Sequence, residues 1–257
     1  MNFLTTIILG VVEGITEFLP VSSTGHLILT AKLLGLAQSD FLKSFEIIIQ
    51  LGAILAVIVL YWKILLINFK ALKRIAVAFI PTALIGFTIY KSIKKFLLGN
   101  NQVVLWSLFL GGIVIIVFER IHREKKEAIG EISELSYGKA FMVGLFQSIA
   151  MIPGVSRSAA SILGGLTLSL KRKTAVEFSF LLAVPTMLAA TGLDLVKSAG
   201  TFSSHQVLFL LSGFVTAFIV AILAIKFLLQ FIENHNFTAF GIYRVLLALI
   251  FWLALRV

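Results

Sequence analysis

Two short polar motifs hold the side chains of this protein that could do chemistry. The first combines two carboxylates, a run of hydroxyls and an imidazole within fourteen residues, Glu13-Gly-Ile-Thr-Glu17-Phe-Leu-Pro-Val-Ser-Ser-Thr-Gly-His26. The second adds a guanidinium and further hydroxyls, in Pro153-Gly-Val-Ser-Arg157-Ser. Acid, base, nucleophile and cation together suit the binding of a phosphate and chemistry on it. Both motifs interrupt apolar sequence, where ionisable groups are costly and mark functional sites.

The first motif carries a pair of carboxylates. Glu13 and Glu17 are four residues apart, so on a helix they share one face, one turn apart. Two bare carboxylates so placed repel each other in a medium of low dielectric. A divalent cation relieves that repulsion, because hard cations such as Mg²⁺ and Ca²⁺ prefer oxygen ligands. We predict that both residues bind a metal; a general base and an exposed helix end are the alternatives.

Hydroxyls and an imidazole follow where a helix is expected to begin. Unpaired N–H groups at a helix N-terminus bind anions, so we predict that Ser22, Thr24 and Gly25 bind phosphate. Simple N-capping is the alternative role for such residues. His26 follows directly, and imidazole is the commonest acid/base group near neutral pH. Its closeness in sequence to Ser23 favours a catalytic role over a structural one.

The second motif contains the one charge of residues 141–170, Arg157. A guanidinium stays charged and therefore needs an anionic partner. One candidate is a phosphate, held together with the hydroxyls and backbone N–H groups of Gly154, Ser156 and Ser158. The other is a carboxylate of the first motif, which we expect as the resting partner.

Four further polar residues lie in apolar segments. Glu46, Gln50 and Glu177 are expected either to support the side chains of the site or to be charges at helix ends. Arg244 lies near the start of the last apolar segment and is expected at the membrane interface.

Composition predicts a membrane protein. The 257 residues are 59% hydrophobic and only 13% charged, with a mean hydropathy of +1.05, whereas soluble domains are about 25% charged. The net charge of +10 does not indicate nucleic-acid binding, because the Lys and Arg residues lie mostly between apolar spans, where they contact lipid headgroups. The absence of cysteine excludes disulfides and thiolate metal sites.

Hydropathy predicts six transmembrane helices, each close to the ~20 residues that cross a bilayer. They are residues 44–62, 75–90, 103–118, 174–193, 207–231 and 239–255. Two more apolar segments, 1–36 and 139–170, are interrupted in the middle by the two polar motifs. Their halves are too short to cross as one helix, and lipid cannot satisfy the broken backbone. We predict two re-entrant helix–loop–helix segments.

The two broken segments match at a constant offset of 134 residues. The offset pairs Gly10 with Gly144, Glu13 with Gln147 and Ser22 with Ser156, and the breaks fall at the same register. Three predicted spans lie between the segments, so the second must enter from the opposite face. This is an inverted repeat, which places paired broken helices together near the midplane. We therefore predict an all-α polytopic integral membrane protein with one membrane domain, residues 1–257, made of repeats 1–118 and 139–257 around a charged loop, 119–138.

Charge predicts the orientation. Thirteen of the 22 Lys and Arg residues fall on one side of the predicted topology and seven on the other. The positive-inside rule makes the richer side cytoplasmic. Both termini and the first broken segment are then expected toward the outside.

The two motifs resemble the signatures of the undecaprenyl-diphosphate phosphatases, also called bacitracin-resistance proteins. Phe45-Glu46-Ile-Ile-Ile-Gln50-Leu-Gly and Glu177-Phe-Ser-Phe-Leu-Leu-Ala-Val-Pro185 are also similar to that family, and the similarity runs along the whole chain. The family pattern is matched at nine positions, which are Glu13, Glu17, Ser22, Ser23, Thr24, His26, Ser156, Arg157 and Ser158. One position departs from it, since the second motif usually ends in Thr where this chain has Ser161; the hydroxyl is kept.

The resemblance implies a phosphatase of the bacterial plasma (inner) membrane. It would hydrolyse undecaprenyl diphosphate to the monophosphate and inorganic phosphate, recycling the carrier lipid of peptidoglycan synthesis, with a divalent cation as cofactor and a site open to the outer, periplasmic face. Its partners are then the lipid diphosphate and the membrane, with no nucleic acid; a homodimer stays open.

Our mechanistic hypothesis is phosphoryl transfer. Arg157, the loop N–H groups and a metal on Glu13 and Glu17 would neutralise developing charge. Ser23 is the first candidate nucleophile, with His26 or Glu17 as its base, and a metal-activated water is the alternative. The rival class is an inverted-repeat transporter or polyprenyl-phosphate flippase without hydrolysis. A transporter has no need of adjacent acid, base and nucleophile, and these are concentrated in the first repeat.

Overall fold

Helices make up the regular structure of the described chain. The computed structural model describes residues 1–37, 39–96, 100–198 and 204–255. Apart from one isolated β-bridge between Ile129 and Leu170, the elements of this part are helices. Two of them are short 3₁₀ turns, η1 just before the second broken segment and η2 within it. In chain order they are α1 (Phe3–Thr16), α2 (Ser23–Leu33), α3 (Asp40–Leu60), α4 (Trp62–Ile67), α5 (Phe69–Phe96), α6 (Asn101–Ile121), η1 (Ile132–Glu134), α7 (Tyr137–Ser148), η2 (Ile149–Met151), α8 (Arg157–Thr167), α9 (Arg172–Ser198), α10 (Ser204–Asn234) and α11 (Thr238–Leu255).

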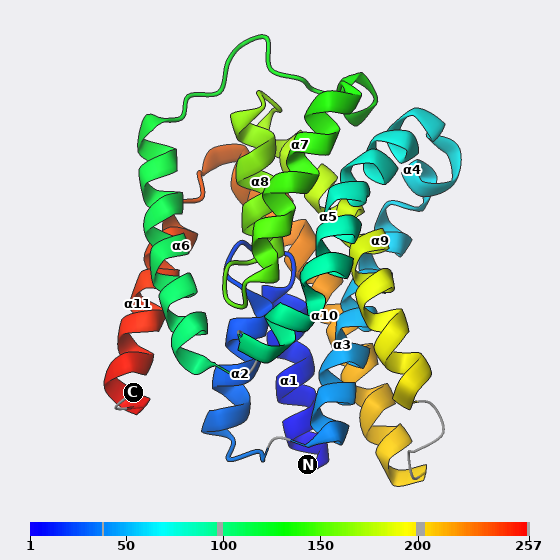
Figure 1. Cartoon of the computed structure of the whole chain (residues 1–257), viewed down its shortest axis with the longest axis vertical. Coiled ribbons are helices and arrows are strands. Elements are labelled where there is room, and N and C mark those ends of the chain that lie inside the picture. Colours follow the sequence, from blue (N-terminus) through cyan, green and yellow to red (C-terminus); the bar gives the residue numbers. More distant parts are fainter. Residues whose placement is uncertain (38, 97–99, 199–203, 256–257) are drawn as a thin grey trace.

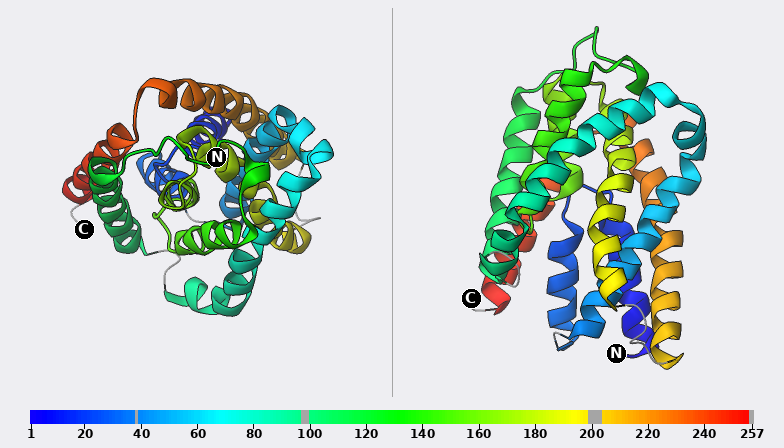
Figure 2. Two further views of the ribbon diagram at one scale, coloured as in Figure 1. Left: turned by 90° about the horizontal axis from the view of Figure 1, so that it is seen from above. Right: turned by 45° about the vertical axis from the view of Figure 1, so that its right-hand side comes forward.

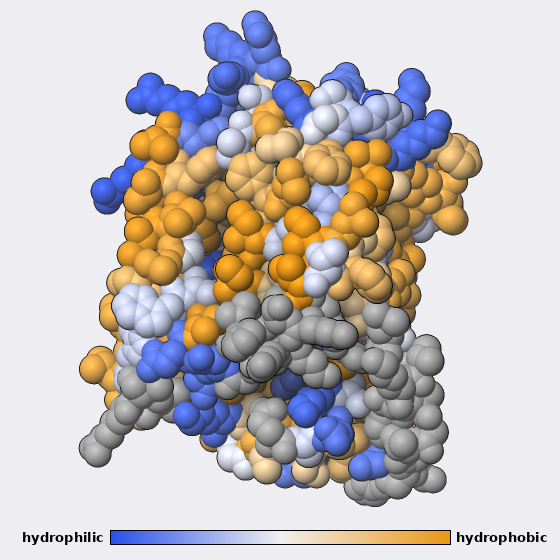
Figure 3. Space-filling view, in the orientation of Figure 1, coloured by the Kyte–Doolittle hydropathy of each residue, from blue (hydrophilic) through white to orange (hydrophobic). Residues whose placement is uncertain are grey.

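The predicted fold class is confirmed. Within the described ranges five helices, α3, α5, α6, α9 and α10, are long and apolar enough to cross a membrane, and α11 is a shorter apolar helix. These are the six elements in which hydropathy predicted the spans. On the face shown in Figure 3, hydrophobic residues form a broad band, and hydrophilic residues gather mainly above and below it. The chain is an all-α polytopic membrane protein.

The two broken segments form helical hairpins that enter from opposite ends. α1 and α2 occupy the lower half of the molecule and α7 and α8 the upper half, so that their connecting loops meet near the middle (Figure 1). Seen from above, α2 and α8 lie near the centre, with α6, α10 and α11 at the periphery (Figure 2). α2 and α8 have 11 residues each. At 1.5 Å per residue each spans about 17 Å, roughly half of the hydrocarbon core. The N-terminus and the C-terminal end of α11 lie toward the lower end (Figure 1).

The two hairpin loops repeat one backbone conformation at the predicted offset. Ser22 and Ser156 precede α2 and α8 with positive φ angles of 72° and 81°, a region that residues other than glycine rarely adopt. Each caps its helix in the same way. The Gly25 N–H donates to Ser22 Oγ at 3.4 Å, and the Ala159 N–H donates to Ser156 Oγ at 3.2 Å. Ser22 therefore performs the capping role that sequence analysis weighed against phosphate binding, and Ser156 performs the same role in the second hairpin.

The first helix of each hairpin packs mainly on a long helix of the other half of the chain. α1 packs most extensively on α10, and its counterpart α7 packs on α5. A glycine allows the close approach in each case: a Cβ at Gly10 would lie 2.8 Å from the Gly213 carbonyl oxygen, and one at Gly144 would overlap the Ala78 carbonyl. Gly10 and Gly144 are again 134 residues apart. The division into repeats 1–118 and 139–257 stays a prediction, which these equivalences support.

Candidate active site

The two hairpin loops are in direct contact. Ser158 Oγ in the second hairpin donates to the Leu19 carbonyl in the first at 2.8 Å. Arg157 Nη2 donates to Glu17 Oε1 at 3.1 Å across the same junction. Because both bonds are enclosed by protein, the polar groups that interrupt the two apolar segments satisfy one another away from lipid.

Glu17 is the centre of this cluster. It ends α1 as its C-cap and is 7% exposed. Its Oε2 accepts the Ser23 hydroxyl at 2.5 Å, while its Oε1 accepts Arg157. One carboxylate thus orients the candidate nucleophile and the candidate phosphate-binding cation together.

Arg157 faces the first hairpin at the start of α8. Its Nη1 donates to the Ser179 carbonyl of α9 at 2.9 Å, and its guanidinium lies 5.9 Å from the Phe18 ring centroid. Nε is buried and has no hydrogen-bond partner among the described residues. The ion pair with Glu17 is the resting arrangement expected from sequence. A substrate phosphate could draw on the unpaired Nε and compete for Nη2.

Glu13 supplies open oxygen ligands. It lies one turn before Glu17, whose N–H donates to the Glu13 carbonyl. Its side chain is fully buried, and both carboxylate oxygens lack a hydrogen-bond partner in the described part of the chain. Unpaired buried carboxylate oxygens beside Glu17 fit a hard cation. No cluster of three or more His, Asp or Glu residues is arranged for a metal within the described ranges. The fit is therefore to an ion such as Mg²⁺, which takes one or two carboxylates and fills its shell with phosphate oxygens and water.

Both ring nitrogens of His26 are engaged away from Ser23. Nδ1 lies 2.8 Å from the Ser22 carbonyl oxygen, and Nε2 lies 2.7 Å from the Tyr243 hydroxyl. A carbonyl only accepts, so Nδ1 carries the proton in the neutral ring and Nε2 accepts from Tyr243. The two rings are stacked, with centroids 5.5 Å apart. The Ser23 hydroxyl turns instead to Glu17.

The remaining predicted phosphate-binding residues line the two loops. Thr24 is exposed, whereas Gly25 is buried. Gly154 adopts a φ of 94°, and Ser156 Oγ lies 3.0 Å from Ser158 Oγ. Hydroxyl groups and the backbone of the hairpin loops are thus gathered where the hairpins meet. The hydroxyls of Ser22, Ser156 and Ser158 also make hydrogen bonds within the protein.

Residues outside the two motifs complete the site, and the prediction for one of them is wrong. Arg244 was expected at the membrane interface, but it is fully buried between α11 and the two loops. Tyr243 and Ser179 were not singled out by sequence analysis. Glu46 has one buried oxygen without a partner among the described residues, while Gln50 and Glu177 are half-buried. The available signal for Arg244 was a cation in an apolar span, the same signal that identified Arg157.

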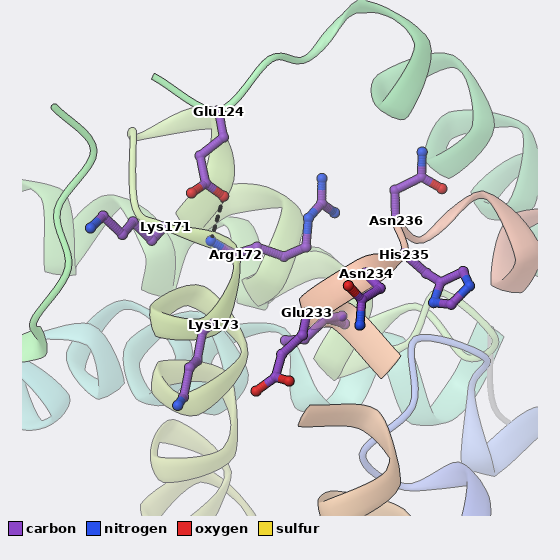
Figure 4. Close-up of a pocket in the computed structure, with 9 residues that line it drawn as sticks. Glu124, Lys171, Arg172, Lys173, Glu233, Asn234, His235 and Asn236 are labelled. Carbon is purple, nitrogen blue, oxygen red and sulfur yellow. Dashed lines mark hydrogen bonds between the residues drawn. The ribbon is translucent and has the colours of Figure 1, made fainter. Parts of the chain in front are cut away.

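A separate polar recess lies near the upper end of the molecule. It is a cavity of about 510 Å³, around which Arg172 places its backbone N–H 3.0 Å from Glu124 Oε2 (Figure 4). The Arg172 guanidinium pairs with Glu119. The lining mixes acidic with basic side chains, and none of the buried side-chain atoms without a partner in the described part of the chain belongs to it.

Comparison with known proteins gives one consistent result. Residues 6–250 match the family model described as "Bacitracin resistance protein BacA". A protein of Aquifex aeolicus named undecaprenyl-diphosphatase is 55% identical over 245 residues, 95% of each chain. A protein of Persephonella marina with the same name is 54% identical over 253 residues, covering 98% of this chain and 99% of that one. A third of this name, from Campylobacter jejuni, is 49% identical over 253 residues, covering 98% and 94% of the two chains. This chain belongs to the bacitracin resistance protein BacA family.

Proposed function

We propose that this chain is an undecaprenyl-diphosphate phosphatase. It hydrolyses undecaprenyl diphosphate to undecaprenyl phosphate and inorganic phosphate, which recycles the carrier lipid of cell-wall synthesis and confers bacitracin resistance. The names of its relatives support this activity. The structural observation that carries the proposal is Glu17, whose two oxygens hold Ser23 of one hairpin and Arg157 of the other.

The terminal phosphate would bind where the two loops meet. Arg157 is the principal cation, because its planar fork suits two phosphate oxygens at once. N–H groups at the start of α2 and α8 and the hydroxyls of Thr24, Ser156 and Ser158 would complete the cradle. Charge on the transferring phosphoryl group is the main obstacle in this chemistry, so fixed donors at its oxygens supply most of the rate.

In our mechanism Ser23 attacks the terminal phosphorus. Its Oγ forms the new P–O bond while Glu17 accepts the hydroxyl proton, for which it already accepts the hydrogen bond. The bond from this phosphorus to the bridging oxygen breaks, and undecaprenyl phosphate leaves with the electron pair. Water then hydrolyses the phosphoserine to inorganic phosphate. His26 lies one helical turn after Ser23 and stays the second candidate for the acid/base.

Glu13 and Glu17 would hold the divalent cation, Mg²⁺ or Ca²⁺. Such an ion supplies charge neutralisation at phosphate oxygens and activates water. Glu13 would offer two open oxygens to the ion, whereas the oxygens of Glu17 also accept hydrogen bonds from Ser23 and Arg157.

Location and partners follow from the same activity. We propose the bacterial plasma membrane as the location. The site would face the outer side, because the side richer in Lys and Arg is expected in the cytoplasm. The lipid substrate would reach the site from the bilayer, and its isoprenyl chain would stay among apolar helices.

Phosphate release from a detergent-solubilised long-chain isoprenyl diphosphate tests the proposal. Purified protein is expected to release phosphate with Mg²⁺ or Ca²⁺ and to lose activity with a chelator. The exchanged packing of α1 on α10 and α7 on α5 also suits a transporter. Binding of the lipid diphosphate without phosphate release under every divalent condition would reject the phosphatase and favour that second function.

A further inference from the structure

Arg244 on α11 joins the two hairpin loops and α6 through one guanidinium. The side chain is completely buried. Nη1 donates to the Pro20 carbonyl of the first loop at 3.3 Å and to the Val155 carbonyl of the second at 2.9 Å. Nη2 donates to the Gly154 carbonyl of the second loop at 2.9 Å. One planar group therefore fixes the separation of the two loops.

The other bonds of Arg244 attach this group to the scaffold. Nη2 also donates to the Ser107 carbonyl at 2.9 Å, and Nε donates to the Leu108 carbonyl at 3.3 Å, both on α6. The five N–H donors of a guanidinium thus meet five backbone carbonyls. Since α6 packs closely on α11, the position of the loops is set relative to two long helices.

The re-entrant loops need such a donor. Carbonyl groups outside a helix have no intrahelical partner, and the interior of a membrane offers no water to replace one. Lysine could not substitute, because its ammonium is a point charge with three donors instead of a planar fork. α6 also makes room for the fork, since a Cβ at Gly111 would overlap Arg244 Nη2.

We propose that Arg244 is a positioning residue that sets the register between the two loops, and so the distance between Ser23 on one and the phosphate-binding Arg157 on the other. It acts through the backbone of the loops and leaves the chemistry to the residues already described. The Glu17–Arg157 pair and the Ser158–Leu19 bond are the contacts that this register permits. This inference deepens the proposed function, and its kinetic test rests on that function.

The kinetic test compares Arg244→Lys with the wild-type protein in the phosphate-release assay. A displacement of about 1 Å of reacting groups lowers rates about 100-fold, so we expect a loss of that size in kcat with a smaller change in KM. Arg172→Lys is the matched control, because Arg172 is another largely buried arginine, although it pairs with Glu119 beside the separate polar recess instead of bonding the hairpin loops. Thermal unfolding of each purified variant shows which ones are folded.

A second test displaces Arg244 without removing it, and compares that variant with a control at the same helix contact. Gly111→Ala places a methyl group against the guanidinium, whereas Gly241→Ala adds a methyl at the same α6–α11 contact, against the Gly112 carbonyl and Ile116. We expect Gly111→Ala to lower kcat at least tenfold more than Gly241→Ala at matched melting temperatures. This pair keeps the proposal testable if Arg244→Lys does not fold.

The distance between the hairpins provides a measurement that is independent of activity. The chain has no cysteine, so nitroxide labels can be placed on Ile15→Cys and Ile152→Cys, positions that are 43% and 39% exposed. Gly111→Ala should broaden or shift the interlabel distance, and Gly241→Ala should leave it unchanged.

The outcomes separate the two proposals. Equal kcat and equal label distances in Gly111→Ala and Gly241→Ala would overturn the role of Arg244. An equal loss in both variants would assign the effect to helix packing and would overturn it too. A wild-type protein that releases no phosphate would reject the proposed function instead, while the label distances would still test Arg244.

Discussion

The two hairpins share a backbone and differ in their side chains. Ser22 and Ser156 have the same positive φ and the same capping bond, 134 residues apart. At the next position of that register the first hairpin has Ser23 and the second has Arg157. The candidate nucleophile and the candidate phosphate-binding cation therefore occupy equivalent places in a duplicated scaffold.

The same contrast appears one helix earlier. Glu13 has two buried oxygens without a partner among the described residues. Its counterpart Gln147 donates Nε2 to Thr82 Oγ1 at 3.1 Å and to Thr186 Oγ1 at 3.0 Å. Gln147 Oε1 is also buried without a partner among the described residues, so the contrast is between a carboxylate with two open oxygens and a neutral amide whose nitrogen is bonded to its neighbours. We propose that duplication supplied the geometry and that divergence made one half reactive and the other half supporting.

The largest effect is expected from Glu17→Gln. The neutral amide can neither accept the Ser23 proton nor form an ion pair with Arg157. We therefore expect kcat/KM to fall by about 10⁴-fold, as when a residue of a catalytic unit is removed. The matched change at the equivalent position of the second hairpin, Met151→Gln, should leave phosphate release within about threefold of the wild type. Similar losses in both variants would show that the hairpins are not specialised as described.

A smaller effect is expected from Arg157→Lys. Lysine keeps the positive charge but loses the fork that contacts Glu17 and the Ser179 carbonyl. We expect a 10²–10³-fold loss of kcat, about the cost of removing one preorganised donor. Steady-state kinetics and melting temperatures measure it, and normal turnover in this variant would remove Arg157 from phosphate binding.

Metal dependence distinguishes Glu13 from Gln147. Glu13→Gln should raise the Mg²⁺ concentration for half-maximal activity by about 10–100-fold, because one hard ligand is lost. Gln147→Glu replaces the amide donor of the second hairpin, so it should lower stability by about 1–3 kcal/mol and leave the Mg²⁺ requirement unchanged. Metal titrations of both variants check this. An unaltered Mg²⁺ requirement in Glu13→Gln would exclude Glu13 as a ligand.

The smallest of these effects is expected from Tyr243→Phe. The Ser22 carbonyl still holds Nδ1 of His26, so only the hydrogen bond at Nε2 is lost. Removing one partner that orients a functional histidine costs about 10-fold in rate. A loss of activity as large as that of Glu17→Gln would instead make Tyr243 a direct participant.

Hydropathy and the 134-residue offset were enough to predict the helical membrane fold, the two broken segments and the pairing of Arg157 with a carboxylate. Those features depend on local composition or on a repeated register. The roles of Tyr243 and Arg244 depend on contacts with residues between 89 and 224 positions earlier in the chain. A cation near the end of an apolar span fits either the interface or a buried ring of carbonyls, and only the packing of α6 and α11 decides between them.

The central claim is that the first hairpin supplies the nucleophile and the second holds the phosphate. The most direct test is to quench the reaction rapidly with an isoprenyl diphosphate labelled at its terminal phosphate, and to map the label on the protein. We predict label on Ser23, and none in Ser23→Ala, which should be inactive. An active Ser23→Ala protein, or label on a serine of the second hairpin, would contradict the account.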